Sequence, residues 1–296
     1  MQAETFFLRA SDGVRLAVHR MGGPEHGPIL VWTHANGFCS HSYQPLLSLL
    51  TRWVRVVGVD ARGHGQSGKP GEPLERTLAL GQLVADYVQV LEALRQAHPG
   101  SPLIGAGHSM GALLPLLAAV QGQALERLVL VEAAVFPPPG HEAREGAAAL
   151  TADRVKNIPR RRARFADPVE LCGSLQRLPA FASVRPEHLL QHCTASLERQ
   201  MDGSYALRCP PAVEAFLYDE ITRFGSYNEL AGLQLPVLLV GADPDHPGSS
   251  WVSKIQSFLK QTIPTSRLQV LAGAGHLAPL QAPVEIAQWM EQWIRS

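Results

Sequence analysis

One short motif, residues 107–111 (GHSMG), has the spacing of a nucleophilic serine held on a tight turn. An apolar stretch at 102–106 predicts a strand before the motif, and residues 112–120 predict a helix after it. A strained strand-to-helix turn lifts a serine hydroxyl out of the backbone, and small flanking residues leave room for that turn. The helix N-terminus favours developing negative charge. We therefore predict that Ser109 is a nucleophile, against the alternative of a structural serine in a glycine-rich turn.

A nucleophilic serine needs a base, and the position of His276 favours it among the twelve histidines. His276 ends the sequence GAGH, which follows the last predicted strand at 267–271. A serine on this kind of turn is followed along the chain first by the acid and then by the histidine. Because the carboxyl ends of parallel strands share one edge of a sheet, we expect His276 to face Ser109.

The acid that orients the histidine has three candidates. Asp243 and Asp245 lie in the sequence GADPD after the predicted strand at 237–240, and Glu132 follows the strand at 128–131. The motif determines the order of the residues but not the offset of the acid from the strand. We favour Asp245 first and Asp243 second, with Glu132 as the third candidate. The two that are not the acid are expected to cap a loop or face solvent.

A tetrahedral intermediate needs two N–H donors for its oxyanion. One is expected from the backbone of Met110, the residue after the nucleophile. The other is expected from the loop after the first core strand, where Asn36 is our choice and Ala35 the next. His34 in the same loop is expected to pack or hydrogen-bond beneath it rather than to take part in the chemistry.

Alternating strand and helix patterns surround these residues. Short apolar runs that end in glycine, histidine or aspartate are typical of buried parallel strands. The pattern predicts an α/β fold with a mainly parallel, doubly wound sheet. The expected strands are 6–9 and 15–19 (a hairpin), 29–33, 54–59, 102–106, 128–131, 237–240 and 267–271, and the expected helices are 78–94, 112–120, 250–262 and 283–294.

The alternation stops at a triple proline, residues 137–139, and resumes only near residue 236. Between them the sequence shows helical stretches near 143–157, 168–176 and 186–196 but no convincing core strand. We therefore expect an α/β core at 1–137 and 228–296 with a helical cap, or lid, inserted at 138–227.

Two features of the predicted cap could face a substrate. The run RRRAR at 160–164 is more typical of a solvated face, and recognition of an acidic substrate is the alternative. Five apolar or aromatic residues could line an acyl pocket or pack onto the core. These five are Phe165, Leu178, Phe181, Phe216 and Tyr218.

Composition excludes several classes of protein. The 296 residues contain 26 Lys and Arg against 26 Asp and Glu, and this zero balance argues against a dedicated nucleic-acid binder. No apolar run is long enough to span a membrane, and the first residues lack the basic start of a signal peptide. The four cysteines form no CxxC pair, so neither a thiolate metal site nor a disulfide framework is expected. We expect a cytoplasmic protein.

Together these motifs resemble those of the α/β-hydrolase superfamily, from about residue 10 to the C-terminus. The landmarks are HANGF at 34–38, DARGHG at 60–65, GHSMG at 107–111, GADPD at 241–245 and GAGH at 273–276. Residues 207–214 also resemble a stretch that is seen in a bacterial subgroup with the same HANGF loop. Two departures stand out: many relatives have His-Gly in place of His34-Ala35, and many have the acid where this chain has Pro244.

The resemblance implies hydrolysis of a small carboxylic ester, thioester or lactone through an acyl-enzyme, without a metal or organic cofactor. A serine at residue 109 argues against relatives that use an aspartate nucleophile. Hydrolysis of a carbon–carbon bond or a peptide by the same triad is an alternative, because fold does not determine function. A small-molecule receptor without turnover, or an interaction protein with a dead site, is a further alternative. A monomer and a homodimer fit equally.

Overall fold

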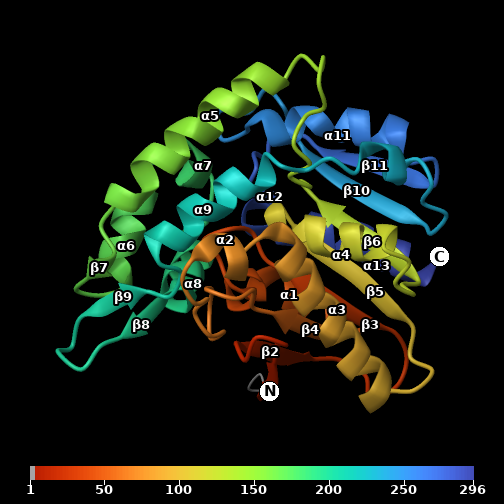
Figure 1. Ribbon diagram of the computed structural model, residues 1–296, viewed down its shortest axis with the longest axis horizontal. Coiled ribbons are helices and arrows are strands. Elements are labelled where there is room, and N and C mark those ends of the chain that lie inside the picture. The colour runs from red at the N-terminus through yellow and green to blue at the C-terminus, as the bar shows by residue number, and fades with distance from the viewer. Residues whose placement is uncertain (1–3) are drawn as a thin grey trace.

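The computed structural model describes residues 4–296, which fold around an eight-stranded sheet (Figure 1). The strand order is β1-β2-β4-β3-β5-β6-β10-β11. β2 pairs antiparallel with β1 and β4, and every other neighbouring pair is parallel, so the predicted mainly parallel α/β fold is confirmed. The strands are β1 (Glu4–Arg9), β2 (Arg15–Gly22), β3 (Ile29–Thr33), β4 (Arg55–Val59), β5 (Leu103–His108), β6 (Arg127–Val131), β10 (Val237–Ala242) and β11 (Ser266–Leu271).

The central strands are buried on both faces, which explains their apolar sequences. All residues of β3, β4, β5 and β10 are buried. Successive side chains of a strand point to opposite faces, so Val31 packs into one core while Leu30 and Trp32 pack into the other.

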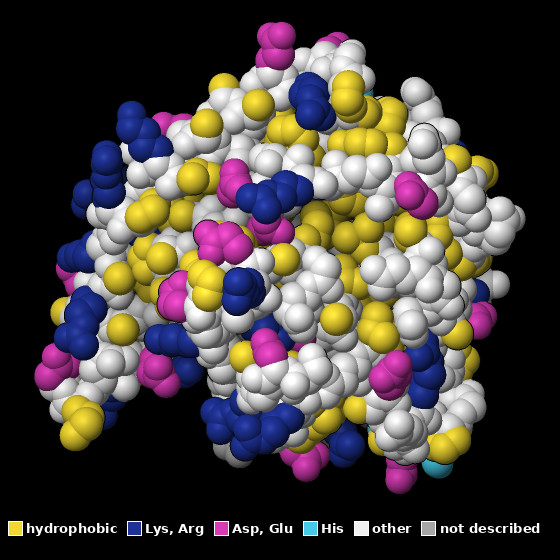
Figure 2. Space-filling view, viewed as in Figure 1, with side chains coloured by type: hydrophobic (Ala, Val, Ile, Leu, Met, Phe, Trp, Pro, Cys, Tyr) yellow, Lys and Arg dark blue, Asp and Glu magenta, His cyan; other side chains and the backbone are white. Residues whose placement is uncertain are grey.

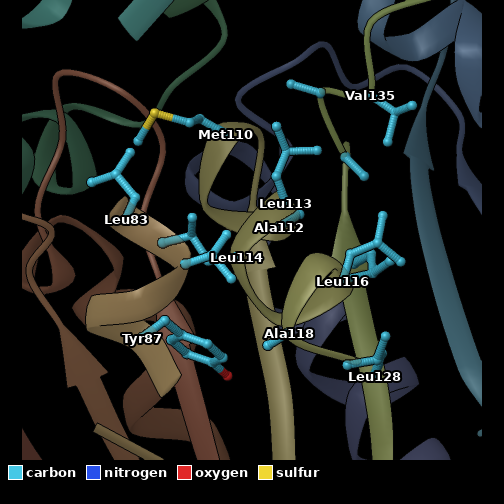
Figure 3. Close-up of a cluster of buried hydrophobic side chains, with 14 of the residues drawn as sticks. Leu83, Tyr87, Met110, Ala112, Leu113, Leu114, Leu116, Ala118, Leu128 and Val135 are labelled. Carbon is cyan, nitrogen blue, oxygen red and sulfur yellow. The ribbon is translucent and has the colours of Figure 1, made fainter. Parts of the chain in front are cut away.

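Helices cover both faces of the sheet. The core on one face contains side chains of α3, α4 and α11, and the core on the other contains those of α1 and α13. In the close-up of the first core, side chains of α4 lie between α3 and β6 (Figure 3), which explains why α4 is apolar all round. The core helices are η1 (Ser40–Tyr43), α1 (Gln44–Leu50), α2 (Leu74–Thr77), α3 (Leu80–Ala97), α4 (Met110–Val120), α11 (Trp251–Thr262), α12 (Ala278–Gln281) and α13 (Pro283–Arg295).

The segment between β6 and β10, residues 138–227 (hereafter the insertion), stands beside the sheet in Figure 1 and contacts α3, α11 and α12. It contains the three expected helical stretches, but also a small antiparallel sheet in the order β7-β9-β8 that the sequence did not predict. Its strands are too short to show a period of two. The elements are α5 (Arg144–Asn157), η2 (Ile158–Arg160), β7 (Arg164–Phe165), α6 (Pro168–Leu175), α7 (Pro179–Ala182), α8 (Pro186–Ser196), β8 (Leu197–Arg199), β9 (Tyr205–Leu207) and α9 (Pro211–Ile221). The short α10 (Tyr227–Leu230) begins at the last residue of the insertion and precedes β10.

The predicted core elements agree with the observed ones to within three residues at either end. Among residues 4–296, no helix combines the length and the apolar character that crossing a membrane requires.

Candidate active site

Ser109 lies on the turn between β5 and α4 with φ 57° and ψ −123°. Within residues 4–296, Ser109 and Glu132 are the only residues other than glycine with a positive φ. Such a conformation costs about 1–3 kcal/mol for a residue with a side chain and is found mainly at functional sites. The turn expected from the GHSMG motif is therefore present, and its strain lies at the serine.

The two glycines of the motif are needed because the backbone is crowded there. A Cβ on Gly107 would lie 2.6 Å from the carbonyl oxygen of Gly111. A Cβ on Gly111 would lie 2.5 Å from the carbonyl oxygen of Thr33, at the end of β3. Real Cβ atoms do not approach backbone so closely, so the spacing of the glycines follows from the packing of this turn against β3.

His276 lies on the loop after β11, and its Nε2 atom is 3.0 Å from Ser109 Oγ. The imidazole is mostly buried, with 15% of the side chain exposed. Two main-chain hydrogen bonds hold the residue: its N–H donates to the Gly248 carbonyl, and its own carbonyl is 2.8 Å from His108 Nε2. The structure thus brings together the two residues that we predicted as nucleophile and base.

The carboxylate beside His276 belongs to Glu132, whose Oε2 atom is 3.1 Å from His276 Nδ1. Glu132 follows β6 and is fully buried. It also accepts hydrogen bonds from the Ala242 N–H at 2.7 Å and from the Ser253 hydroxyl at 2.6 Å. Because a carboxylate only accepts, the Nδ1 atom of His276 carries the proton, and the Nε2 lone pair faces Ser109.

This geometry corrects the expected order of the acids, because neither Asp245 nor Asp243 reaches His276 among the described residues. The carboxylate of Asp243 instead accepts the N–H groups of Asp245 at 3.0 Å and Gly273 at 3.1 Å. These hydrogen bonds lower the Asp243 pKa. Asp245 is exposed. The loop after β10 therefore uses Asp243 as an internal cap, while the longer side chain of Glu132 reaches the histidine from the neighbouring strand end.

In the loop after β3, the backbone amide of Asn36 has no protein acceptor within the described part of the chain. The Ala35 N–H donates to the Tyr43 hydroxyl at 3.0 Å, and the Gly37 N–H donates to His64 Nε2 at 3.1 Å. The backbone N–H groups of Asn36 and Met110 have no hydrogen-bond partner among residues 4–296. The geometry favours Asn36 over Ala35 as the donor from this loop, and the assignment of Asn36 and Met110 stays a prediction.

His34 lies beneath this loop, as the sequence suggested. Its Nε2 atom accepts a hydrogen bond from the Ala61 N–H at 2.9 Å, and the ring is buried. Burial lowers the His34 pKa, so the ring stays neutral and serves as a fixed acceptor.

A buried hydrogen-bond chain, which the sequence did not suggest, links the loop after β3 (residues 34–38, hereafter the proposed oxyanion loop) to His276. The Ala35 N–H donates to the Tyr43 oxygen. Because the His276 carbonyl can only accept, Nε2 of the neutral His108 ring carries the proton, and its Nδ1 accepts from the Tyr43 hydroxyl at 2.8 Å. His108 Nε2–H then donates to the His276 carbonyl. Burial and the neighbouring His276 hold the His108 pKa well below its usual range, so this ring is neutral. The only signal in the sequence was the place of His108 inside the serine motif.

Ser109 and His276 open into a cavity of about 430 Å³ between the core and the insertion. Of the five residues proposed for an acyl pocket, Phe165, Leu178, Phe181 and Tyr218 line the cavity, whereas Phe216 packs against the core. The other lining residues are about evenly divided between apolar and polar side chains, and a few placed polar groups in an apolar surround are typical of small-molecule sites. The charged lining residues are Arg154, Arg161, Arg162 and Glu214.

Comparisons with known proteins agree with this fold. The model of the alpha/beta hydrolase family matches residues 29–289. The chain is 26% identical to 3-oxoadipate enol-lactonase 1 of Acinetobacter baylyi, over 100% of this chain and 98% of that protein. Its fold resembles E-2-(acetamidomethylene)succinate hydrolase, with a TM-score of 0.78, 21% identity and coverage of 99% and 100%. A thermophilic esterase from Thermogutta terrifontis superposes with a TM-score of 0.71, 20% identity and coverage of 100% and 98%.

Proposed function

The chain belongs to the alpha/beta hydrolase family, and from this premise we propose that it hydrolyses a carboxylic ester, thioester or lactone through an acyl-enzyme. The observation that carries the proposal is the line of hydrogen bonds from Ser109 through His276 to Glu132 at the floor of the cavity. The lactonase to which the chain is similar along its whole length supports this substrate class.

In the proposed mechanism, Ser109 Oγ attacks the substrate carbonyl while His276 Nε2 removes the hydroxyl proton. Glu132 holds the imidazole in the required tautomer and stabilises the imidazolium. The N–H groups of Met110 and Asn36 bind the oxyanion. His276 then returns the proton to the leaving group. Water, deprotonated by His276, attacks the acyl-enzyme and releases the acid and free Ser109.

The insertion acts in this proposal as the cap of the site. It supplies much of the apolar lining, including Phe165, Leu171 and Phe181, so its side chains determine which acyl groups fit. Its α9 is tied to the proposed oxyanion loop, because Asn36 Nδ2 donates to the Glu214 carbonyl at 2.8 Å. The expectations of a cytoplasmic location and of a monomer or homodimer stay predictions.

The alternatives differ in the bond that is cleaved or in the absence of turnover. Hydrolysis of a carbon–carbon bond or an amide would use the same three residues. A receptor without turnover has less support. His276 is within hydrogen-bond distance of both Ser109 and Glu132, and the N–H groups of Asn36 and Met110 have no protein acceptor among the described residues.

The test is turnover of p-nitrophenyl esters from acetate to decanoate by the wild type and by Ser109→Ala, with fluorophosphonate labelling of both. We expect the wild type to cleave short esters and take the label, and Ser109→Ala to lose both. Labelling without ester cleavage would point to carbon–carbon or amide substrates. Neither labelling nor turnover, with the protein folded, would overturn the acyl-enzyme proposal and favour the receptor.

A further inference from the structure

The arginine run of the insertion divides into residues with exposed ion pairs and one residue, Arg161, with a buried counter-ion. Arg162 pairs with Glu170 at 2.6 Å and Arg164 with Asp202 at 3.0 Å, both at exposed positions. Lys and Arg side chains are visible along the edge of the molecule where Figure 1 places α5 and α6 (Figure 2). Arg161 and Arg162 both line the cavity, but Arg161 is only 35% exposed whereas Arg162 is 52% exposed. The solvated-face interpretation therefore holds for part of the run only.

Arg161 forms an ion pair with Glu214, which is 7% exposed. The carboxylate of Glu214 lies against the proposed oxyanion loop, since a Cβ on Gly37 would be 3.0 Å from its Cδ atom. Burial raises the Glu214 pKa, and the positive charges of Arg161 and Arg154 oppose this rise. The Glu214 carboxylate therefore lies between the Arg161 guanidinium and the loop that is proposed to bind the oxyanion.

Arg154 on α5 is a second cation of the cavity, and no carboxylate among residues 4–296 forms an ion pair with it. Its guanidinium lies over the ring of Tyr218, 4.8 Å from the centroid, and this contact holds the group in place. Arg162 is neutralised by Glu170, so Arg154 and Arg161 against Glu214 leave one positive charge in excess at this side of the cavity. A half-buried charge without a counter-ion is unfavourable, and a ligand anion would neutralise it.

We propose that Arg154 and Arg161 form a carboxylate-binding subsite, so that the substrate is an ester or lactone that carries a second, free carboxylate. The inference rests on the proposed hydrolase function, which it deepens. Planar guanidinium groups bind carboxylates through paired N–H donors, and a single excess charge matches a monoanion. The cavity volume limits the acyl part to a small one.

The test compares two esters with the same leaving group and chain: mono-p-nitrophenyl adipate and its methyl ester. We expect the kcat/KM of the wild type to be at least about tenfold higher for the acid than for the methyl ester. The reason is that hydrogen bonds to charged groups contribute more free energy than hydrogen bonds between neutral groups. Arg154→Gln and Arg161→Gln should lower kcat/KM for the acid at least about tenfold more than for the methyl ester. Added salt should reduce the preference of the wild type.

Arg160→Gln is the matched control, because Arg160 belongs to the same run but is exposed and does not line the cavity. It should keep the preference for the acid. An equal loss for both esters in Arg154→Gln would overturn the subsite and point to a structural role. Cleavage of the methyl ester without preference for the acid would also overturn the subsite, while the hydrolase function stands.

Calorimetric binding of adipate tests the subsite without turnover. We expect adipate to bind the wild type and Arg160→Gln, and to bind Arg154→Gln at least about tenfold more weakly. If neither ester is cleaved, the hydrolase proposal fails, and this binding decides the subsite alone. Equal binding to all three proteins, or no binding to the wild type, would overturn it.

Discussion

Ser109 and Glu132 adopt backbone conformations that favour glycine, and both contact His276. The Ser109 hydroxyl lies beside one nitrogen of the His276 ring, and the Glu132 carboxylate lies beside the other. Strained backbone conformations thus occur on both sides of this imidazole. Ser109 Oγ is 3.0 Å from Nε2 of His276, and Glu132 Oε2 is 3.1 Å from its Nδ1. Both distances are ordinary for hydrogen bonds. At the scale of single residues, the site is preorganised before any substrate enters.

We predict that Glu132→Gln lowers kcat for p-nitrophenyl acetate by about 10³–10⁴-fold, because the neutral amide no longer selects the productive tautomer or stabilises the imidazolium. Steady-state kinetics, with circular dichroism to verify folding, measure this effect. Asp245→Asn is the matched control and should stay close to the wild type, since Asp245 is exposed and does not contact His276. The reverse result, a large loss in Asp245→Asn and a small one in Glu132→Gln, would restore the aspartate as the acid.

At the scale of elements, β3, β5 and α4 are joined directly beneath the nucleophile. Pro115 inside α4 has no N–H, so the Gly111 carbonyl lacks its helical partner and accepts the Thr33 hydroxyl at 2.6 Å instead. The end of β3 thereby fastens the first turn of α4. The same close approach leaves no space for a side chain at residue 111.

Gly111→Ala should therefore destabilise the fold by about 2 kcal/mol or more, because the added methyl group would displace the backbone at the end of β3. Urea unfolding of both proteins measures the difference. Gly81→Ala is the control: it lies in α3, where a Cβ meets nothing within 4 Å, and it should be neutral or stabilising by up to about 1 kcal/mol. Equal stability of Gly111→Ala and the wild type would refute the packing argument.

At the scale of the whole molecule, four histidines are buried with lowered pKa values. Burial is the largest cause in each case, and it lowers the pKa values of His64 and His192 to about 3. Each ring accepts or donates fixed hydrogen bonds as a neutral group. The unfolded chain protonates the same histidines near pH 6.5, so acid favours the unfolded state.

We predict that the free energy of unfolding falls by at least about 2 kcal/mol between pH 7 and pH 5. The sign follows from the lowered pKa values: stability is present above pH 6.5 and is lost as the pH falls through the range between the two pKa values. Glu214 acts in the opposite direction, because burial raises its pKa, but it is one group against four. Urea unfolding at each pH measures the slope, and His192→Gln should make it shallower. A flat profile from pH 7 to 5 would contradict this view.

Most core elements, and the two residues that meet at the candidate site, could be predicted from the sequence. Apolar runs and helical spacing are local properties, so they predicted the core strands and the four longest core helices, but not the shorter η1, α1, α2 and α12. The serine motif and the chain order likewise pointed to Ser109 and His276, because the turn needs small residues at set positions. The short strands of the insertion were not predicted, because two or three residues show no period.

Which carboxylate lies beside His276, and which groups surround it, could be read only from the folded chain. Glu132 and His276 are 144 residues apart, and whether they meet depends on which strand ends are neighbours and on how far each side chain reaches. The hydrogen bond between Tyr43 and His108 likewise depends on the fold. So does the position of Arg154, which lines the cavity only when the insertion is folded. Spacing along a sequence encodes local geometry, whereas a contact between distant residues depends on the packing of the whole sheet.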